Sequence, residues 1–188
     1  TVSYGGGTAQ GPAALLEASQ QVELFDVDEQ SEPYKKGIAT LEFPPAMNDA
    51  TKAVQYGYDV AKEIVGKNKI PILLGGEHSL SAGPVRAVAE KYGNISLLHF
   101  DAHGDFRDTY HGDKFSHASV LRRCHEIPGV SMIVQAGIRN VSNDPADGSE
   151  FDYMQAHKDT IKVYYAKDMK SWDIGEMVGH LTDNVYIT

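Results

Sequence analysis

Residues 97–105 read Leu-Leu-His-Phe-Asp-Ala-His-Gly-Asp, an apolar run that ends abruptly in acidic and imidazole side chains. The run predicts a buried strand over Ile95 to Phe100, followed by Asp101, His103 and Asp105 at alternate positions. Alternate residues of an extended backbone point the same way, so we expect these three side chains to converge. Burying a carboxylate is costly unless it is paired or bound to a metal ion. The pattern therefore favours a metal site over a solvated polar loop.

A second run of the same kind lies upstream. Residues 70–79 read Ile-Pro-Ile-Leu-Leu-Gly-Gly-Glu-His-Ser, which predicts a strand over Ile70 to Leu74, a tight glycine turn and then His78. Alone this is a weak signal, but two such strand ends in one small chain are unlikely to be a coincidence. Ligands of parallel sheets lie beyond the carboxyl ends of the strands, which is where both motifs fall.

The rest of the chain alternates helical and strand patterns. Asn48 is a candidate helix cap, and residues 29–45, which include Pro33, Pro44 and Pro45, are predicted to be a surface connection. Periodicity predicts helices near 13–19, 48–65, 79–92, 116–126, 149–157 and 174–181, and strands at 22–25, 131–138, 161–165 and 185–188. Strands separated by helices imply a three-layer α/β/α fold with a mainly parallel sheet, here as a single domain over residues 1–188.

Composition narrows the class of protein. The 188 residues carry a net charge of −9, which argues against nucleic-acid binding and suits a cationic substrate. The one cysteine, Cys124, excludes an internal disulfide and fits a buried thiol in a reducing, cytoplasmic environment. No apolar stretch reaches the length of a transmembrane helix, so we expect no membrane partner.

The motifs at 75–79 (Gly-Gly-Glu-His-Ser) and 101–105 (Asp-Ala-His-Gly-Asp) resemble two signature motifs of the ureohydrolases, which include arginases and agmatinases. The resemblance runs from the glycine-rich start at residues 4–7 to the end of the chain. It implies an arginase/deacetylase-like fold, two manganese ions, homo-oligomers and hydrolysis of guanidino groups to urea. Glu77 departs from the Asp that many members carry, with little expected consequence because that carboxylate is not a metal ligand in the family.

The resemblance also assigns roles to residues. His78, Asp101 and Asp105 resemble the ligands of one Mn²⁺ ion, and His103 with the other oxygen of Asp101 resembles those of the second. Carboxylate-rich sites with one imidazole for each ion suit Mn²⁺ better than zinc. His117 matches a family histidine that is not a ligand, and we expect it to deliver a proton to the leaving amine.

Three histidine assignments stay open on the residues alone. His117 could instead make a local hydrogen bond at a helix start, and His111 could compete with it for the proton-transfer role. His99 precedes the ligand set by two positions and shares its face. For His99, a supporting or core role is favoured over direct ligation.

Part of the family pattern is not in this sequence. The third motif, Ser-Xaa-Asp-Xaa-Asp, supplies two further metal-binding aspartates, and a glutamate that holds the guanidinium follows it. We expect both after Thr188, so that the chain, which starts at Thr1 rather than Met, is a fragment or the ordered part of a longer protein.

The resulting hypothesis is an agmatinase that converts agmatine and water to putrescine and urea. Segments 106–110 and 114–119 are most similar to agmatinases, and the loop at 108–114 lacks the Asn- and Ser-rich character with which arginases hold an amino acid. The alternatives are arginase, guanidinobutyrase or another guanidino-acid hydrolase, a zinc deacetylase of the same architecture, and a non-catalytic homologue if the protein truly ends at Thr188.

Overall fold

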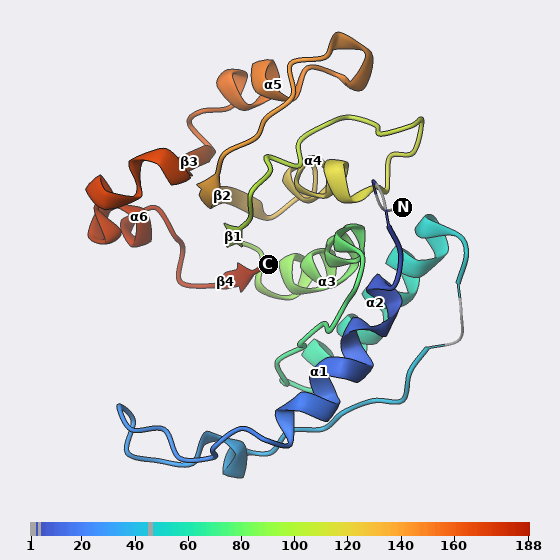
Figure 1. Cartoon of the computed structure of the whole chain (residues 1–188), viewed down its shortest axis with the longest axis vertical. Coiled ribbons are helices and arrows are strands. Elements are labelled where there is room, and N and C mark those ends of the chain that lie inside the picture. The colour runs from blue at the N-terminus through green and yellow to red at the C-terminus, as the bar shows by residue number, and fades with distance from the viewer. Residues whose placement is uncertain (1–2, 4, 45–46) are drawn as a thin grey trace.

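The structure is a computed structural model that describes residues 3, 5–44 and 47–188. Thr1, Tyr4 of the glycine-rich start and Pro45 of the predicted connection lie outside the described residues. The fold is organised around one parallel sheet of four strands in the order β3-β2-β1-β4 (Figure 1). The strands are β1 (Ile95–Phe100), β2 (Val130–Ile138), β3 (Ile161–Tyr165) and β4 (Val185–Ile187). Every neighbouring pair is parallel, which confirms the predicted α/β class.

Helices connect successive strands and cover both faces of the sheet. The connections contain α4 (Val120–His125), α5 (Glu150–Ala156) and α6 (Ile174–Gly179). On one face, Leu97 and Ile133 join a buried core with residues of α2 (Ala50–Gly66), α3 (Ala82–Tyr92) and α4. On the other face, Val134 packs with Met177 of α6. The sheet therefore lies between two helical layers, as Figure 1 shows for α3 and α6.

The helix pair α2 and α3 forms the most extensive helix–helix contact. Asp49, one residue after the predicted cap, begins α2 by accepting a hydrogen bond from the backbone N–H of Lys52 at 3.0 Å. At Gly83 in α3, a Cβ would lie only 2.3 Å from the carbonyl oxygen of Val54. The two helices approach closely because that position is glycine.

Two predicted strands are wrong. Residues 22–25 form no strand, and Val22, Leu24 and Phe25 are all exposed. Residues 70–74 also form no strand, and the side chain of Ile70 is 87% exposed. Neither run pairs with a neighbour among the described residues, and Pro71 has no backbone N–H to offer one. An apolar run becomes a strand only where another strand satisfies its backbone groups.

The other predicted elements are confirmed with shifted boundaries. The predicted helix at 13–19 is α1 (Gly11–Ser19), and the predicted helices at 79–92 and 116–126 begin as 3-10 turns, η3 (His78–Ser81) and η4 (His117–Ser119). The sequence pattern does not predict four further 3-10 turns, η1 (Thr8–Gln10), η2 (Pro33–Lys36), η5 (Pro145–Asp147) and η6 (Ala166–Ser171). Short turns of this kind carry no clear apolar periodicity.

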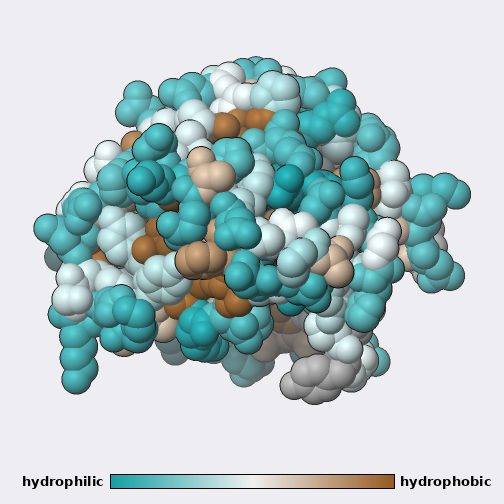
Figure 2. Space-filling model, turned by 90° about the horizontal axis from the view of Figure 1, so that it is seen from above, coloured by the Kyte–Doolittle hydropathy of each residue, from teal (hydrophilic) through white to brown (hydrophobic). Residues whose placement is uncertain are grey.

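One face of the molecule is mostly polar. Figure 2 shows one face on which hydrophilic side chains predominate and hydrophobic areas are small and separate. Among the described residues, no helix combines the length and apolar character needed to cross a membrane. Cys124 is buried, as predicted, and burial raises the pKa of its thiol to about 12.

Candidate metal centre

Four potential metal ligands meet at the carboxyl edge of the sheet. They are His78, His99, Asp101 and Asp105, and one ligand atom from each lies within 4.8 Å of the others. His99 belongs to β1, the two aspartates follow it, and His78 opens η3. The two sequence motifs therefore come together as predicted, although only the 101–105 motif follows a strand.

A capped 3-10 turn, rather than a strand end, positions His78. Glu77 caps η3: its Oε2 accepts hydrogen bonds from the Ser79 backbone N–H, at 2.9 Å, and from the Ser79 hydroxyl. At Gly76, a Cβ would lie 2.1 Å from the carbonyl oxygen of Thr8, so only glycine fits there. Gly76 thus allows close packing of the turn against η1, just before the start of η3.

Asp105 occupies a left-handed backbone conformation, with φ +60°. This conformation is uncommon for a residue with a side chain, although Asp tolerates it better than most. The side chain is buried, at 7% exposure, and its Oδ2 lies 3.0 Å from Nδ1 of His78. Strained backbone of this kind is concentrated at functional sites, and here it turns the carboxylate toward the imidazole.

The distances in this cluster fit a metal ion. Nδ1 of His78 lies 3.0 Å from Asp105 Oδ2 and 3.8 Å from Asp101 Oδ2. Ligands about 2.1 Å from one octahedral ion are roughly 3 Å apart. One imidazole and two carboxylates are donors that manganese accepts. His78, Asp101 and Asp105 can therefore hold one divalent cation after small adjustments.

The two oxygens of Asp101 face different histidines. Oδ2 faces His78, whereas Oδ1 accepts a hydrogen bond from the His103 backbone N–H at 2.9 Å and lies 3.2 Å from the Nδ1 atom of that residue. The His103 side chain is 61% exposed and lies outside the four-residue cluster. Asp101 is thus placed between two imidazoles, while the assignment of His103 to a second ion stays a prediction.

Electrostatics in the cluster favour charged side chains. Burial by itself lowers the pKa of His78, but the hydrogen bond with Asp105 and the nearby carboxylates raise it above its usual value. Burial opposes ionisation of Asp101, yet the imidazole of His99 and the backbone N–H of His103 hold its pKa well below the usual range. Protons therefore compete with a metal ion more strongly at His78 than at Asp101.

Glu150, which no sequence motif marks, anchors the chain directly after the Asp101–Asp105 turn. This buried carboxylate accepts hydrogen bonds from the backbone N–H groups of Phe106 and Ser142, both at 2.7 Å. At Gly104, a Cβ would lie 2.7 Å from Glu150 Oε1. Burial raises the pKa of Glu150, against the effect of these hydrogen bonds. The one sequence signal that could have pointed to Glu150 is its place as an acidic residue at the first position of a helix.

His117 lies beside Glu77 rather than in the four-residue cluster. Its Nδ1 is 3.4 Å from Glu77 Oε1, and its Nε2 is 3.0 Å from the hydroxyl of Ser3. Tyr110 packs edge-on against the ring. His117 thus contacts the residue that precedes His78 in the chain, and its role in proton transfer stays a prediction. His111 is exposed and contacts Tyr110.

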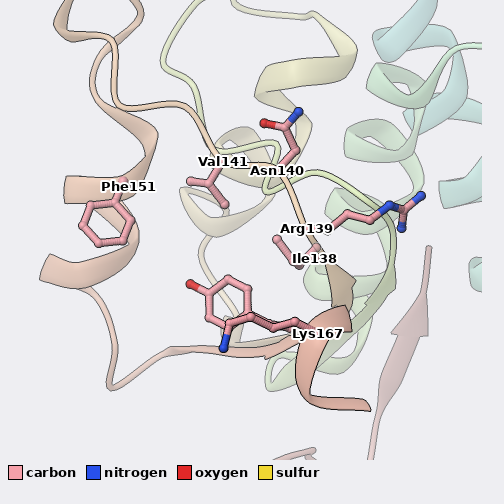
Figure 3. Close-up of a pocket in the computed structure, with 7 residues that line it drawn as sticks. Ile138, Arg139, Asn140, Val141, Phe151 and Lys167 are labelled. Carbon is pink, nitrogen blue, oxygen red and sulfur yellow. The ribbon is translucent and has the colours of Figure 1, made fainter. Parts of the chain in front are cut away.

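Two pockets open along this edge of the sheet. One, of about 280 Å³, is lined by the 75–78 turn, Asp101 and Thr188, and so includes two of the candidate ligands, His78 and Asp101. The other, of about 300 Å³, lies at the ends of β2 and β3, where Val141, Phe151 and Lys167 line it (Figure 3). Its lining contains no carboxylate or imidazole, so it offers no metal site. In Figure 3, the Arg139 side chain extends away from Phe151 and Lys167.

Comparison with known proteins identifies one family. The model of the Arginase family matches residues 1–188. An agmatinase from Pyrococcus horikoshii is 31% identical over 193 residues, covering 100% of this chain and 62% of the relative. An N(1)-aminopropylagmatine ureohydrolase from Synechocystis is also 31% identical, with coverage of 100% and 62%.

The fold comparison agrees. The crystal structure of an agmatine ureohydrolase of Thermoplasma volcanium superimposes with a TM-score of 0.85 at 30% identity, covering 100% of this chain and 61% of that protein. This likeness confirms the predicted arginase-like architecture. The chain spans about three-fifths of the length of these relatives.

Proposed function

Because this chain belongs to the arginase family, we propose that its protein is a manganese-dependent ureohydrolase that converts agmatine and water to putrescine and urea. The observation that carries the proposal is the convergence of His78, Asp101 and Asp105, with ligand atoms 3.0 and 3.8 Å apart. The similarity to agmatinases supports the choice of substrate. Homo-oligomeric assembly and a cytoplasmic location remain predictions from the sequence.

The proposed metal site has two parts. His78, Asp101 and Asp105 would hold one Mn²⁺ ion, and His103 with the second oxygen of Asp101 would contribute to another. The two oxygens of Asp101 face different histidines, and this arrangement supports a role for Asp101 as a ligand shared by both ions. When bound, divalent ions at such a site act as Lewis acids and lower the pKa of water from about 16 toward neutrality.

His117 donates the proton that the leaving amine requires. The Glu77 carboxylate faces its Nδ1 and favours a proton on that nitrogen, so Nε2 is left to accept a proton and return it. Tyr110 limits the movement of the ring. A net charge of −9 favours approach of agmatine, which carries two positive charges, over arginine, whose α-carboxylate leaves it with one net positive charge.

A second candidate substrate is N(1)-aminopropylagmatine. The Synechocystis enzyme named for this compound is as similar to the chain as the Pyrococcus agmatinase, at 31% identity over the whole chain. Both compounds present the same guanidino group on a cationic chain, so the metal cluster does not distinguish them. The choice depends on the pocket beside it.

The test is urea release by the Mn²⁺-loaded protein, expressed from its complete reading frame. Agmatine, N(1)-aminopropylagmatine, arginine and 4-guanidinobutyrate are supplied in parallel. We expect urea from agmatine and little from arginine. Urea from the aminopropyl compound alone would reassign the substrate. Bound metal without urea from any of the four would contradict the ureohydrolase proposal and leave a non-catalytic homologue.

A further inference from the structure

His99 and Gln135 form a buried pair behind the candidate ligands. They lie opposite each other in the register of β1 and β2, and both side chains are fully buried. Gln135 Nε2 lies 3.0 Å from His99 Nδ1 and 2.7 Å from the carbonyl oxygen of Gly104. The imidazole of His99 also stacks on that of His78, with ring centroids 5.3 Å apart.

These contacts determine the direction of each hydrogen bond. The Gly104 carbonyl can only accept, so the atom of Gln135 that faces it must be the amide nitrogen. The second hydrogen of that nitrogen then points at His99 Nδ1, which must accept it and therefore carries no proton. A neutral imidazole protonated at only one position carries its hydrogen on the other nitrogen. The neutral form of His99 selected by Gln135 is thus protonated at Nε2.

The Nε2 atom of His99 is directed toward the aspartates. It lies 3.6 Å from Asp101 Oδ2 and 4.0 Å from Asp105 Oδ2. Among the described residues it is a buried nitrogen without a hydrogen-bond partner. A nitrogen that carries a proton cannot bind a metal ion, because a ligating imidazole offers a lone pair. A small movement would bring the buried Nε2–H of His99 within hydrogen-bond distance of one of the two carboxylates.

We propose that His99 is a positioning residue rather than the fourth ligand of the cluster, and that Gln135 holds it with its Nε2–H directed at the Asp101 and Asp105 carboxylates. The inference rests on the metal centre proposed above. The donor orients oxygens that would otherwise rotate, and leaves their remaining lone pairs for the ion. Outer partners of this kind commonly change metal affinity by about 10- to 100-fold.

The direct test is the protonation of His99 in the metal-free protein, expressed from its complete reading frame. The ¹⁵N shifts of its two ring nitrogens, assigned through the backbone, distinguish the two neutral forms. We expect a protonated Nε2 and an unprotonated Nδ1. Protonation at Nδ1 would overturn the proposal. The result depends on neither bound metal nor activity, so it stands even if the proposed function fails.

The second test compares substitutions by Mn²⁺ affinity. His99→Phe keeps a ring but removes the donor, and we expect affinity to fall about 10- to 100-fold. His99→Gln places an amide N–H near the position of Nε2 and should recover most of the loss. If His99 had a merely structural role, His99→Phe would retain more Mn²⁺ affinity than His99→Gln, because the apolar ring fills the buried site better. Affinity of His99→Phe equal to that of the unmodified protein would overturn the proposal.

Gln135→Leu removes the amide while keeping a similar volume. We expect weaker Mn²⁺ binding and loss of the single protonation pattern of His99. Ile133→Val, on the same strand and equally buried, is the control and should change neither. If the unmodified protein binds no Mn²⁺ at millimolar concentration, the metal proposal fails, and the ¹⁵N shifts still decide the pairing of Gln135 with His99.

Discussion

Two apolar runs precede the candidate ligands, and only one of them is a strand. Residues 95–100 form β1, which pairs with β2 on one side and β4 on the other. Residues 70–74 have a similar composition but remain unpaired, and Ile72 is 78% exposed. Each run is nevertheless followed by a histidine or aspartate of the same cluster.

The comparison separates two ways of positioning a ligand. Asp101 and Asp105 depend on the buried strand before them and on Glu150 beneath their turn. His78 depends on the cap that Glu77 provides and on the close packing of Gly76. The ligand geometry therefore rests on the sheet on one side and on a short capped turn on the other.

The largest expected effect comes from removing a ligand on the β1 side. Asp101→Asn should abolish tight Mn²⁺ binding and lower the rate of urea release by about 10³-fold or more, since metal ions supply several kcal/mol of transition-state stabilisation. Calorimetric Mn²⁺ titration and a urea assay measure both effects. Asp168→Asn, at an exposed acidic residue far along the chain, is the control. Comparable losses in both variants would remove Asp101 from the site.

Matched side-chain truncations, one in each apolar run, test the contrast between residues 95–100 and residues 70–74. In the 188-residue chain, Leu97→Ala should lower the free energy of unfolding by about 2–5 kcal/mol, because Leu97 is fully buried in the main core. Ile70→Ala should change it by less than about 0.5 kcal/mol, because its side chain is 87% exposed. Urea denaturation measures both values. A loss at Ile70 as large as that at Leu97 would show that another segment covers the run.

Glu150→Gln tests the support beneath the aspartates. The substitution replaces one of two accepting oxygens with a donor that faces a backbone N–H, so we expect a loss of about 1–3 kcal/mol in unfolding free energy. Mn²⁺ affinity should fall as well, because the Asp101–Asp105 turn loses its anchor. The exposed Glu23→Gln serves as the control. Unchanged stability and affinity would show that the turn holds its shape without Glu150.

For the ion that His78, Asp101 and Asp105 would hold, the pH dependence of binding should come from the η3 side. The pKa of His78 is raised above its ordinary 6.5, whereas that of Asp101 is lowered, so above about pH 5 a proton competes with this ion mainly at His78. Affinity should rise with pH, by at most tenfold for each pH unit, and level off above the His78 pKa. In His78→Asn the affinity should be lower and this slope lost. A slope that persists in that variant would assign the competing proton to another residue.

The sequence predicts much of the fold and of the candidate site, and the predictions that are wrong or missing have physical causes. Periodicity finds β1 to β4 and the long helices because their residues pack on both faces of the sheet. It fails at residues 22–25 and 70–74 because strand formation depends on a partner that local sequence does not reveal. The 101–105 motif brings Asp101 and Asp105 to one site, but through the left-handed backbone at Asp105 rather than through the alternation of an extended chain, which also predicts His103 in the same cluster. It does not identify Gln135 or Glu150, whose contacts are set by register and by long-range packing.

In the proposed metal centre, the end of β1 and the start of η3 hold one metal ion together. Anomalous diffraction from crystals of the complete protein soaked in Mn²⁺, recorded on either side of the manganese absorption edge, tests it most directly. We expect a peak within bonding distance of His78 Nδ1 and of one oxygen each from Asp101 and Asp105, with His99 outside that distance. The absence of a peak there at saturating Mn²⁺, or a peak bonded to Nε2 of His99, would contradict this account.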